Sequence, residues 1–154
     1  MKFTCKSLED TKKLAQKFAA LVSRSGCFTS FYGEIGAGKT AFIKFMLEEI
    51  GVTTKVTSPS FVILNEYHGN HLPAYHFDLY RLETEGLKTI QSELVEYSRD
   101  GVITLVEWAE FGGDELPFER VSVKVKYGEN EERIYEFEGV GKKYEEVLNE
   151  LARV

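Results

Sequence analysis

Residues 27–51 of the chain read CFTSFYGEIGAGKTAFIKFMLEEIG. The first six residues are mostly apolar, as in a short buried strand, and the run from Phe42 to Ile50 repeats apolar residues at helical spacing. A glycine loop, Gly33 to Thr40, lies between the two, and Gly51 closes the helical run. This order of strand, glycine loop and helix predicts an α/β domain built around a loop that binds phosphate.

The loop Gly33-x-x-x-x-Gly38-Lys39-Thr40 matches the Walker A pattern in full. Its glycines let successive backbone N–H groups point at one anion, and the helix that follows adds its positive N-terminal end. In this chemistry the lysine reaches the β- and γ-phosphates, and the hydroxyl of Thr40 takes one position on Mg²⁺. The loop therefore predicts binding of a nucleotide with magnesium.

Two acidic residues are candidates for the metal and for hydrolysis. Glu107 follows the continuous apolar run 102–106, where a strand beside the loop would present an acid to the magnesium. Asp78 shares one face of an alternating segment with His76 and is a second candidate, either for the metal or for positioning the attacking water. A surface ion pair between Asp78 and Arg81 is the structural alternative.

Other polar and aromatic positions leave alternatives open. The hydroxyl-rich segment Thr57-Ser58-Pro59-Ser60 could close over the γ-phosphate, or form an ordinary turn at the proline. Trp108, the only tryptophan, fits either a core or rim aromatic or a platform that stacks on a base. The three histidines lack the partners of a zinc site.

The rest of the chain completes one mixed α/β domain over residues 1–154. Ser7 and Asp10 form a capping box, which predicts a helix to about Arg24. Further predicted elements are strands at 61–68 and 72–79, a helix through Leu87 and Leu94, a strand at 102–106, an antiparallel hairpin at 121–137 and a helix at 144–151. We expect a mixed sheet with helices on both faces and antiparallel hairpins.

Composition excludes several classes of protein. The 154 residues are 43% hydrophobic and 29% charged, which is typical of a globular chain. Residues 1–82 carry a net charge of +3 and residues 83–154 a net charge of −9, without the basic stripe of a protein that grips nucleic acid alone. No segment has the roughly 20 apolar residues of a membrane span, and no signal peptide is visible. With two reduced cysteines, Cys5 and Cys27, we expect a cytoplasmic protein without a membrane partner.

Four segments together resemble the bacterial TsaE (YjeE) family, the small P-loop ATPases needed to make threonylcarbamoyladenosine in tRNA. They are GEIGAGKT (33–40), TSPSFVILNEY (57–67), HFDLYRL (76–82) and VEWAE (106–110). The resemblance covers roughly residues 7–140. It implies a P-loop NTPase fold and an ATPase that docks on the TsaB–TsaD pair, with tRNA reached only through that complex.

The resemblance also implies roles for individual residues. Lys39, Ser60, Asp78 and Glu107 become catalytic candidates, and Ser58 falls on a position linked to switching. Thr40 and Glu107 would bind Mg²⁺. The residues expected to bind ATP are Leu8, Thr11, Gly33, Gly36, Ala37, Gly38, Lys39, Thr40, Ala41, Trp108 and Arg133, with Leu8 and Thr11 near the base.

The chain departs from the family pattern at Ala41 and Ser60, where threonine is usual, and it matches poorly over 83–100. Two other functions stay open on the sequence alone. A small-molecule kinase would need an acceptor pocket and usually an arginine-rich lid, whereas no two of the six arginines are close together. A nucleotide-gated binding module that hydrolyses very slowly is the other alternative.

Overall fold

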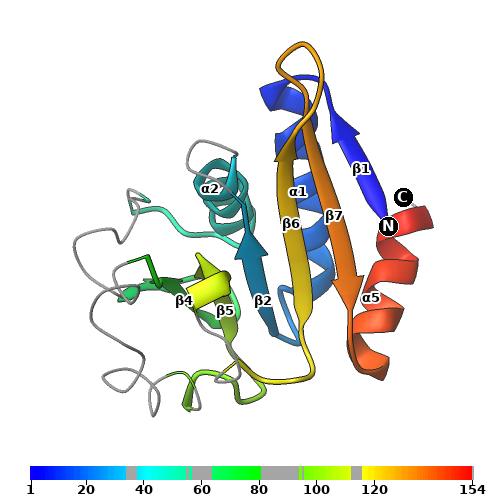
Figure 1. Cartoon of the computed structure of the whole chain (residues 1–154). Coiled ribbons are helices and arrows are strands. Elements are labelled where there is room, and N and C mark those ends of the chain that lie inside the picture. The colour runs from blue at the N-terminus through cyan, green and yellow to red at the C-terminus, as the bar shows by residue number, and fades with distance from the viewer. Residues whose placement is uncertain are drawn as a thin grey trace.

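The computed structural model describes residues 1–33, 38–54, 56, 64–80, 94, 96–111 and 116–153 (Figure 1). These residues build one seven-stranded mixed sheet in the order β1-β7-β6-β2-β5-β4-β3. The strands are β1 (Lys2–Cys5), β2 (Cys27–Tyr32), β3 (Leu64–His68), β4 (Pro73–Asp78), β5 (Ile103–Glu107), β6 (Val121–Tyr127) and β7 (Arg133–Gly139). The helices are α1 (Leu8–Val22), α2 (Lys39–Glu49), the short 3₁₀ helix η2 (Ala109–Phe111) and α5 (Lys142–Arg153).

The centre of the sheet is parallel and its flanks are antiparallel. Strand β2 runs parallel to both β5 and β6, and β4 runs parallel to β5. Strands β3, β7 and β1 are added antiparallel to β4, β6 and β7. The carboxyl ends of β2, β4 and β5 therefore meet at one edge, which is where open α/β sheets bind their ligands.

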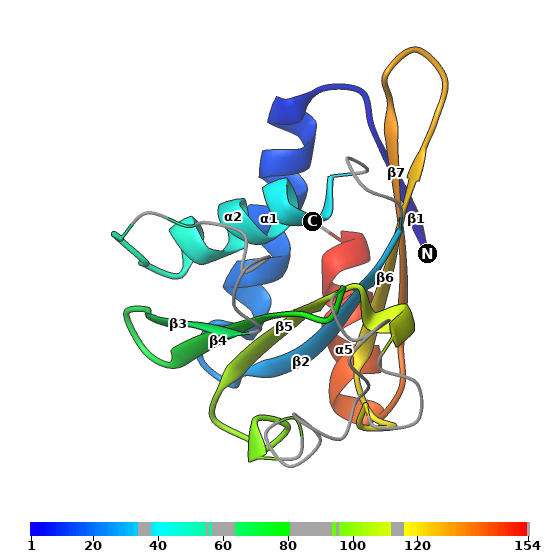
Figure 2. The ribbon, with the colours of Figure 1, turned by 60° about the vertical axis from the view of Figure 1, so that its left-hand side comes forward.

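The larger hydrophobic core lies between the sheet and helices α1, α2 and α5, which share one side of it (Figure 2). Aromatic rings fill its middle: the ring centroid of Phe42 on α2 lies 5.8 Å from Phe31 and 5.0 Å from Tyr135. Phe18 of α1 packs edge-on against Phe137 of β7 at 5.4 Å. Burying each such ring favours folding by roughly 2–3 kcal/mol, so this cluster fixes α2 firmly on the sheet.

The opposite side of the sheet is covered over β2, β4 and β5 by a smaller core. Phe28, Phe77 and Val106 pack there with Leu94, with Ala109 of η2 and with Leu116. The predicted mixed α/β fold with antiparallel hairpins is confirmed. Among the described elements, helices α1, α2 and α5 all lie on one face of the sheet, and only the short η2 lies on the other.

Individual elements agree with the sequence prediction to within a few residues. The hydroxyl of Ser7 accepts a hydrogen bond from the N–H of Asp10 at 3.2 Å, which caps α1 as expected, and α1 ends at Val22 rather than near Arg24. Strand β1, which the sequence did not reveal, adds Lys2 to Cys5 to the edge of β7. The predicted strand start at 61 and most of the helix through Leu87 lie outside the described residues. No helix among the described residues is long and apolar enough to cross a membrane.

Candidate nucleotide and metal site

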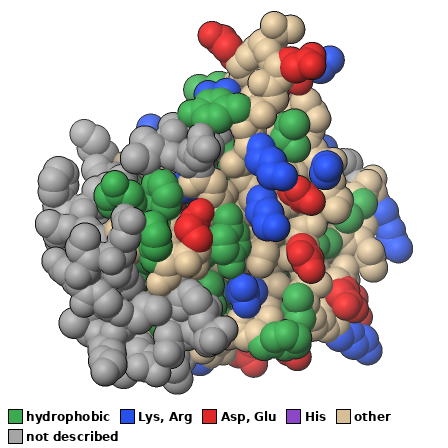
Figure 3. All heavy atoms as spheres, viewed as in Figure 1, with side chains coloured by type: hydrophobic (Ala, Val, Ile, Leu, Met, Phe, Trp, Pro, Cys, Tyr) green, Lys and Arg blue, Asp and Glu red, His purple; other side chains and the backbone are tan. Residues whose placement is uncertain are grey.

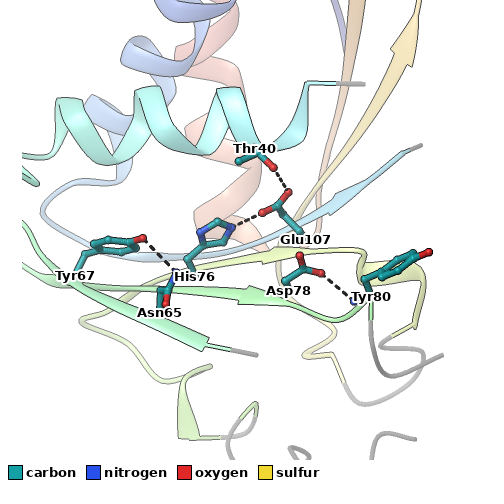
Figure 4. A network of polar contacts seen from close by, with 7 residues as sticks. All are labelled: Thr40, Asn65, Tyr67, His76, Asp78, Tyr80 and Glu107. Atoms are coloured by element: carbon teal, nitrogen blue, oxygen red, sulfur yellow. Dashed lines mark hydrogen bonds and ion pairs between the residues drawn. The ribbon is translucent and has the colours of Figure 1, made fainter. Parts of the chain in front are cut away.

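The N-terminus of α2 faces the carboxyl ends of β4 and β5 (Figure 4). Gly38 precedes the helix with φ +112°, and no side chain caps it. The N–H groups of Lys39, Thr40 and Ala41 therefore lack helical acceptors and add to the positive end of the helix dipole. A Cβ at Gly38 would lie 2.8 Å from the hydroxyl of Tyr135, so both the backbone angle and the space require glycine here. This helix start is suited to an anion.

A chain of three side chains crosses from the helix to the sheet (Figure 4). The exposed hydroxyl of Thr40 donates to Oε1 of Glu107 at 2.6 Å. The other carboxylate oxygen, Oε2, lies 2.5 Å from Nε2 of His76, whose side chain is fully buried. Both oxygens of Glu107 are therefore held, one from α2 and one from β4.

Glu107 is buried, and the groups around it favour its ionised form. Burial raises its pKa, but the hydrogen bond and charge of His76, the hydrogen bond from Thr40 and the charge of Lys39 together outweigh that effect, so the pKa lies below its usual value. A carboxylate next to a threonine hydroxyl supplies hard oxygen ligands, which Mg²⁺ prefers.

Asp78 is paired in register with Glu107 on the neighbouring strand. Its Oδ1 accepts the N–H of Tyr80 at 2.9 Å (Figure 4), and only 5% of the residue is exposed. Burial raises its pKa; the N–H of Tyr80 opposes that rise, and the negative charge of Glu107 adds to it. The two acids therefore differ in proton affinity although their strands are adjacent. Arg81, the predicted ion-pair partner of Asp78, lies outside the described residues.

Lys39 is folded against the protein. Its ammonium group donates to the carbonyl of Gly33 and lies 3.4 Å from the centroid of the Trp108 ring, leaving the residue 4% exposed. Burial lowers its pKa, although the nearby carboxylates of Glu110, Glu107 and Asp78 oppose this shift. Trp108 adopts φ +57° and stacks on Phe111 with ring centroids 5.8 Å apart. The sequence was compatible with Trp108 as a core or rim aromatic or as a platform that stacks on a base. In the structure its ring contacts the ammonium group of Lys39.

A cavity of about 510 Å³ lies beside the start of α2. Five residues expected from the sequence to bind ATP line it: Leu8, Thr11, Gly38, Ala41 and Arg133. The sequence reasoning missed the further lining residues Cys5, Lys6, Ser7, Glu131 and Tyr135. The alternation of Tyr135 with Phe137 indicated the buried face of a strand, but only the pairing of β1 with β7 brings the N-terminal residues beside it.

The expected site residues thus fall into three sets. Gly33, Lys39, Thr40, Asp78, Glu107 and Trp108 gather at the carboxyl edge of β2, β4 and β5. The cavity residues lie next to them around Gly38. Gly36, Ala37, Ser58 and Ser60 lie outside the described residues. His76 was not expected to act at the site, although its alternation with Asp78 placed both on the same strand face.

Comparisons with known proteins show which family this chain resembles. The family model described as "Threonylcarbamoyl adenosine biosynthesis protein TsaE" matches residues 5–135. The TsaE protein of Bacillus subtilis is 39% identical over 145 residues, covering 94% of this chain and 89% of its own length. That of Rickettsia bellii is 33% identical over 129 residues, covering 83% and 88%. The crystal structure of Bacillus subtilis YdiB superposes with a TM-score of 0.82 at 36% identity, covering 99% of this chain and 94% of that one. Because the family model matches most of the chain and these relatives are more than 30% identical over most of its length, the chain belongs to the TsaE family of threonylcarbamoyladenosine biosynthesis proteins.

Proposed function

We propose that this protein binds ATP with Mg²⁺ and hydrolyses it in support of threonylcarbamoyladenosine formation on tRNA. The observation that carries the proposal is the 2.6 Å hydrogen bond between Thr40 and Glu107 at the uncapped start of α2. It joins an anion-binding helix end to a pair of hard oxygen ligands, which is the combination that a magnesium–nucleotide complex requires.

The residues present fit such a complex. The N–H groups of Lys39, Thr40 and Ala41, the first three residues of α2, would bind phosphate oxygens, and Thr40 and Glu107 would hold the metal. Among the described residues no group of three His, Cys, Asp or Glu side chains could hold a metal without a ligand's help. This agrees with Mg²⁺, which is usually bound by one or two protein side chains together with phosphates. When bound, the ion would neutralise phosphate charge.

The cavity beside the helix start is suited to the nucleoside. It continues from Gly38 and Ala41, next to the phosphate position, to Leu8 and Thr11 at the beginning of α1. Leu8 is 65% exposed and offers an apolar surface for a base, while Arg133 supplies a cation at the cavity wall. We assign the base and ribose to this space.

We assign the roles in the hydrolysis step to Asp78 and Lys39. Asp78 lies beside Glu107 without sharing the hydrogen bond to Thr40, so we assign it to orienting the attacking water. Lys39 would leave Trp108 and Gly33 to balance the charge that develops on the transferring phosphoryl group.

We further propose that the protein acts with TsaB and TsaD and reaches tRNA only through them. On the face seen in Figure 3, basic and acidic groups are interspersed over β6 and β7, as in the 3.6 Å ion pair between Lys126 and Glu136. With a net charge of −6, the isolated chain should bind tRNA weakly, since phosphate neutralisation dominates such affinity. Sub-micromolar tRNA binding by the chain alone at physiological salt would contradict this assignment.

The decisive test is phosphate release from ATP, with and without TsaB and TsaD. We expect Lys39→Ala to lower the rate by roughly a hundredfold, because it removes a cation from the developing charge. Lys44→Ala is the matched control, since this lysine is exposed on the same helix. Hydrolysis by Lys39→Ala within about threefold of wild type, or no hydrolysis by wild type even with both partners, would overturn the proposed function.

A further inference from the structure

His76 is a fully buried histidine that no role assigned so far explains. It lies on β4, on the sheet face beneath α2, with Nε2 2.5 Å from Oε2 of Glu107. Its other ring nitrogen, Nδ1, is buried and has no hydrogen-bond partner among the described residues. Among the described residues, the ring is therefore directed at Glu107 alone.

The partner of the ring decides which of its nitrogens acts as the donor. A carboxylate accepts hydrogen bonds, so in this 2.5 Å contact Nε2 of His76 is the donor and Oε2 of Glu107 is the acceptor. The ring therefore directs the N–H of Nε2 at the carboxylate of Glu107.

That donor completes the restraint on Glu107. Thr40 donates to Oε1, and Thr40 itself is half of the proposed metal site. With Oε2 fixed by His76, the carboxylate cannot rotate away from Thr40 (Figure 4). Side chains that orient metal ligands in this way typically change metal affinity by about 10- to 100-fold when they are removed.

We propose that His76 is a positioning residue for magnesium, which acts by holding Glu107 in the orientation that presents Oε1 beside Thr40. His76 contacts neither nucleotide nor metal in this role. The inference rests on the proposed function, since it assumes that Glu107 and Thr40 hold the ion.

The test compares substitutions that keep or remove the directed N–H. His76→Phe keeps a ring of similar size without a donor; His76→Gln places an N–H at about the position of Nε2; His76→Asn places one nearer the backbone. For each variant, affinity for a non-hydrolysable ATP analogue is measured by calorimetry across a MgCl₂ series, together with the melting temperature of the free protein.

We expect the Mg²⁺ concentration that gives half of the maximal increase in nucleotide affinity to rise about tenfold in His76→Phe and His76→Asn. In His76→Gln this concentration should stay within about threefold of wild type. Affinity without Mg²⁺ should be unchanged in all three. In a Glu107→Gln background, His76→Phe should have no further effect on the Mg²⁺ dependence, because His76 acts only through Glu107.

The outcomes separate the two proposals. If the nucleotide affinity of the wild-type protein does not depend on Mg²⁺, both the proposed function and this inference are overturned. If the nucleotide affinity of the wild-type protein depends on Mg²⁺ and His76→Phe has the same Mg²⁺ midpoint, only this inference is overturned. If His76→Phe does not fold, the His76→Gln and His76→Asn variants test the inference. Equal Mg²⁺ midpoints for these two variants would exclude a directed donor at Nε2.

Discussion

At the scale of single residues, the site separates two carboxylates that lie side by side on adjacent parallel strands. Glu107 has both oxygens bound by Thr40 and His76, and its pKa is lowered. Asp78 accepts one backbone N–H and has its pKa raised by burial. Environments that shift the pKa values of two neighbouring acids in opposite directions usually indicate two different tasks.

Substitution of each acid by its amide should separate a role in metal binding from a role in turnover. Glu107→Gln should weaken magnesium-dependent nucleotide binding and hydrolysis together, because a neutral amide is a poorer ligand for a hard cation. Asp78→Asn should leave nucleotide affinity within about twofold and lower turnover by roughly a hundredfold, as expected for a group needed mainly in the transition state.

The measurements are Mg²⁺–nucleotide affinity, turnover and melting temperature on both variants. Loss of metal-dependent binding in Asp78→Asn together with normal binding in Glu107→Gln would show that the two roles are reversed. A fall in melting temperature that accounts for the lost activity of Asp78→Asn would make Asp78 structural.

At the scale of elements, helix α1 is held at its start by a side chain that also borders the cavity. Ser7 accepts the N–H of Asp10 at 3.2 Å, and the carboxylate of Asp10 accepts the N–H of Lys6 at 3.0 Å. Both bonds satisfy backbone donors near the start of the helix. The cap therefore supports the cavity wall formed by Leu8 and Thr11.

Ser7→Ala should destabilise the protein by about 1 kcal/mol, because it leaves a helix N–H without its acceptor. For a chain of this length that corresponds to a fall of roughly 2–4 °C in melting temperature. Ser23→Ala is the control: this hydroxyl follows the end of the same helix and bonds the carbonyl of Ala20 on the surface. Equal melting temperatures for the two variants would contradict the capping assignment.

The elements also show which parts of the fold could be predicted. The strand ending at Glu107 was predictable because burial on both faces leaves a continuous apolar run. Helix α1 was predictable because Ser7 is a typical N-cap residue at its start. Strand β1 was not, since four residues with one buried side chain carry too little alternation. The pairing of His76 with Glu107 depends on which side chains meet across β4 and β5 beneath α2, and spacing along one strand does not encode it.

At the scale of the whole molecule, weakly acidic groups are buried where their charged forms are disfavoured. Burial raises the pKa of Cys27 to about 11, and it raises the pKa values of Tyr135 and Tyr144 to about 12 each. The hydroxyl of Tyr144 accepts the N–H of Phe28 at 3.0 Å and so links α5 to β2. The hydroxyl of Tyr135 donates to the carbonyl of Gly38 at 3.4 Å, a hydrogen bond that only the protonated phenol can make.

The protein should therefore lose stability in alkali. Above pH 9 the unfolded thiol ionises while the folded one stays protonated, and the tyrosines follow above pH 10. The unfolded state then binds fewer protons than the folded state, so the free energy of unfolding falls as pH rises towards 11 or 12.

Denaturant unfolding at pH values from 8 to 11 measures this slope. Tyr144→Phe should lower stability at pH 8 through the lost hydrogen bond and should flatten the alkaline decline, because one of the titrating groups is gone. A stability that is constant across this range in the wild-type protein would contradict the predicted linkage.

The contact between Lys39 and Trp108 gives the molecule a built-in optical signal. Trp108 is the only indole in the chain, so intrinsic emission excited at the indole band arises from a single fluorophore. A cation 3.4 Å from the ring centre perturbs that emission directly. Any ligand that draws the ammonium towards a phosphate removes the perturbation. Stopped-flow fluorescence of the unlabelled protein would therefore record the movement of the loop lysine in real time, without a dye or a labelled nucleotide.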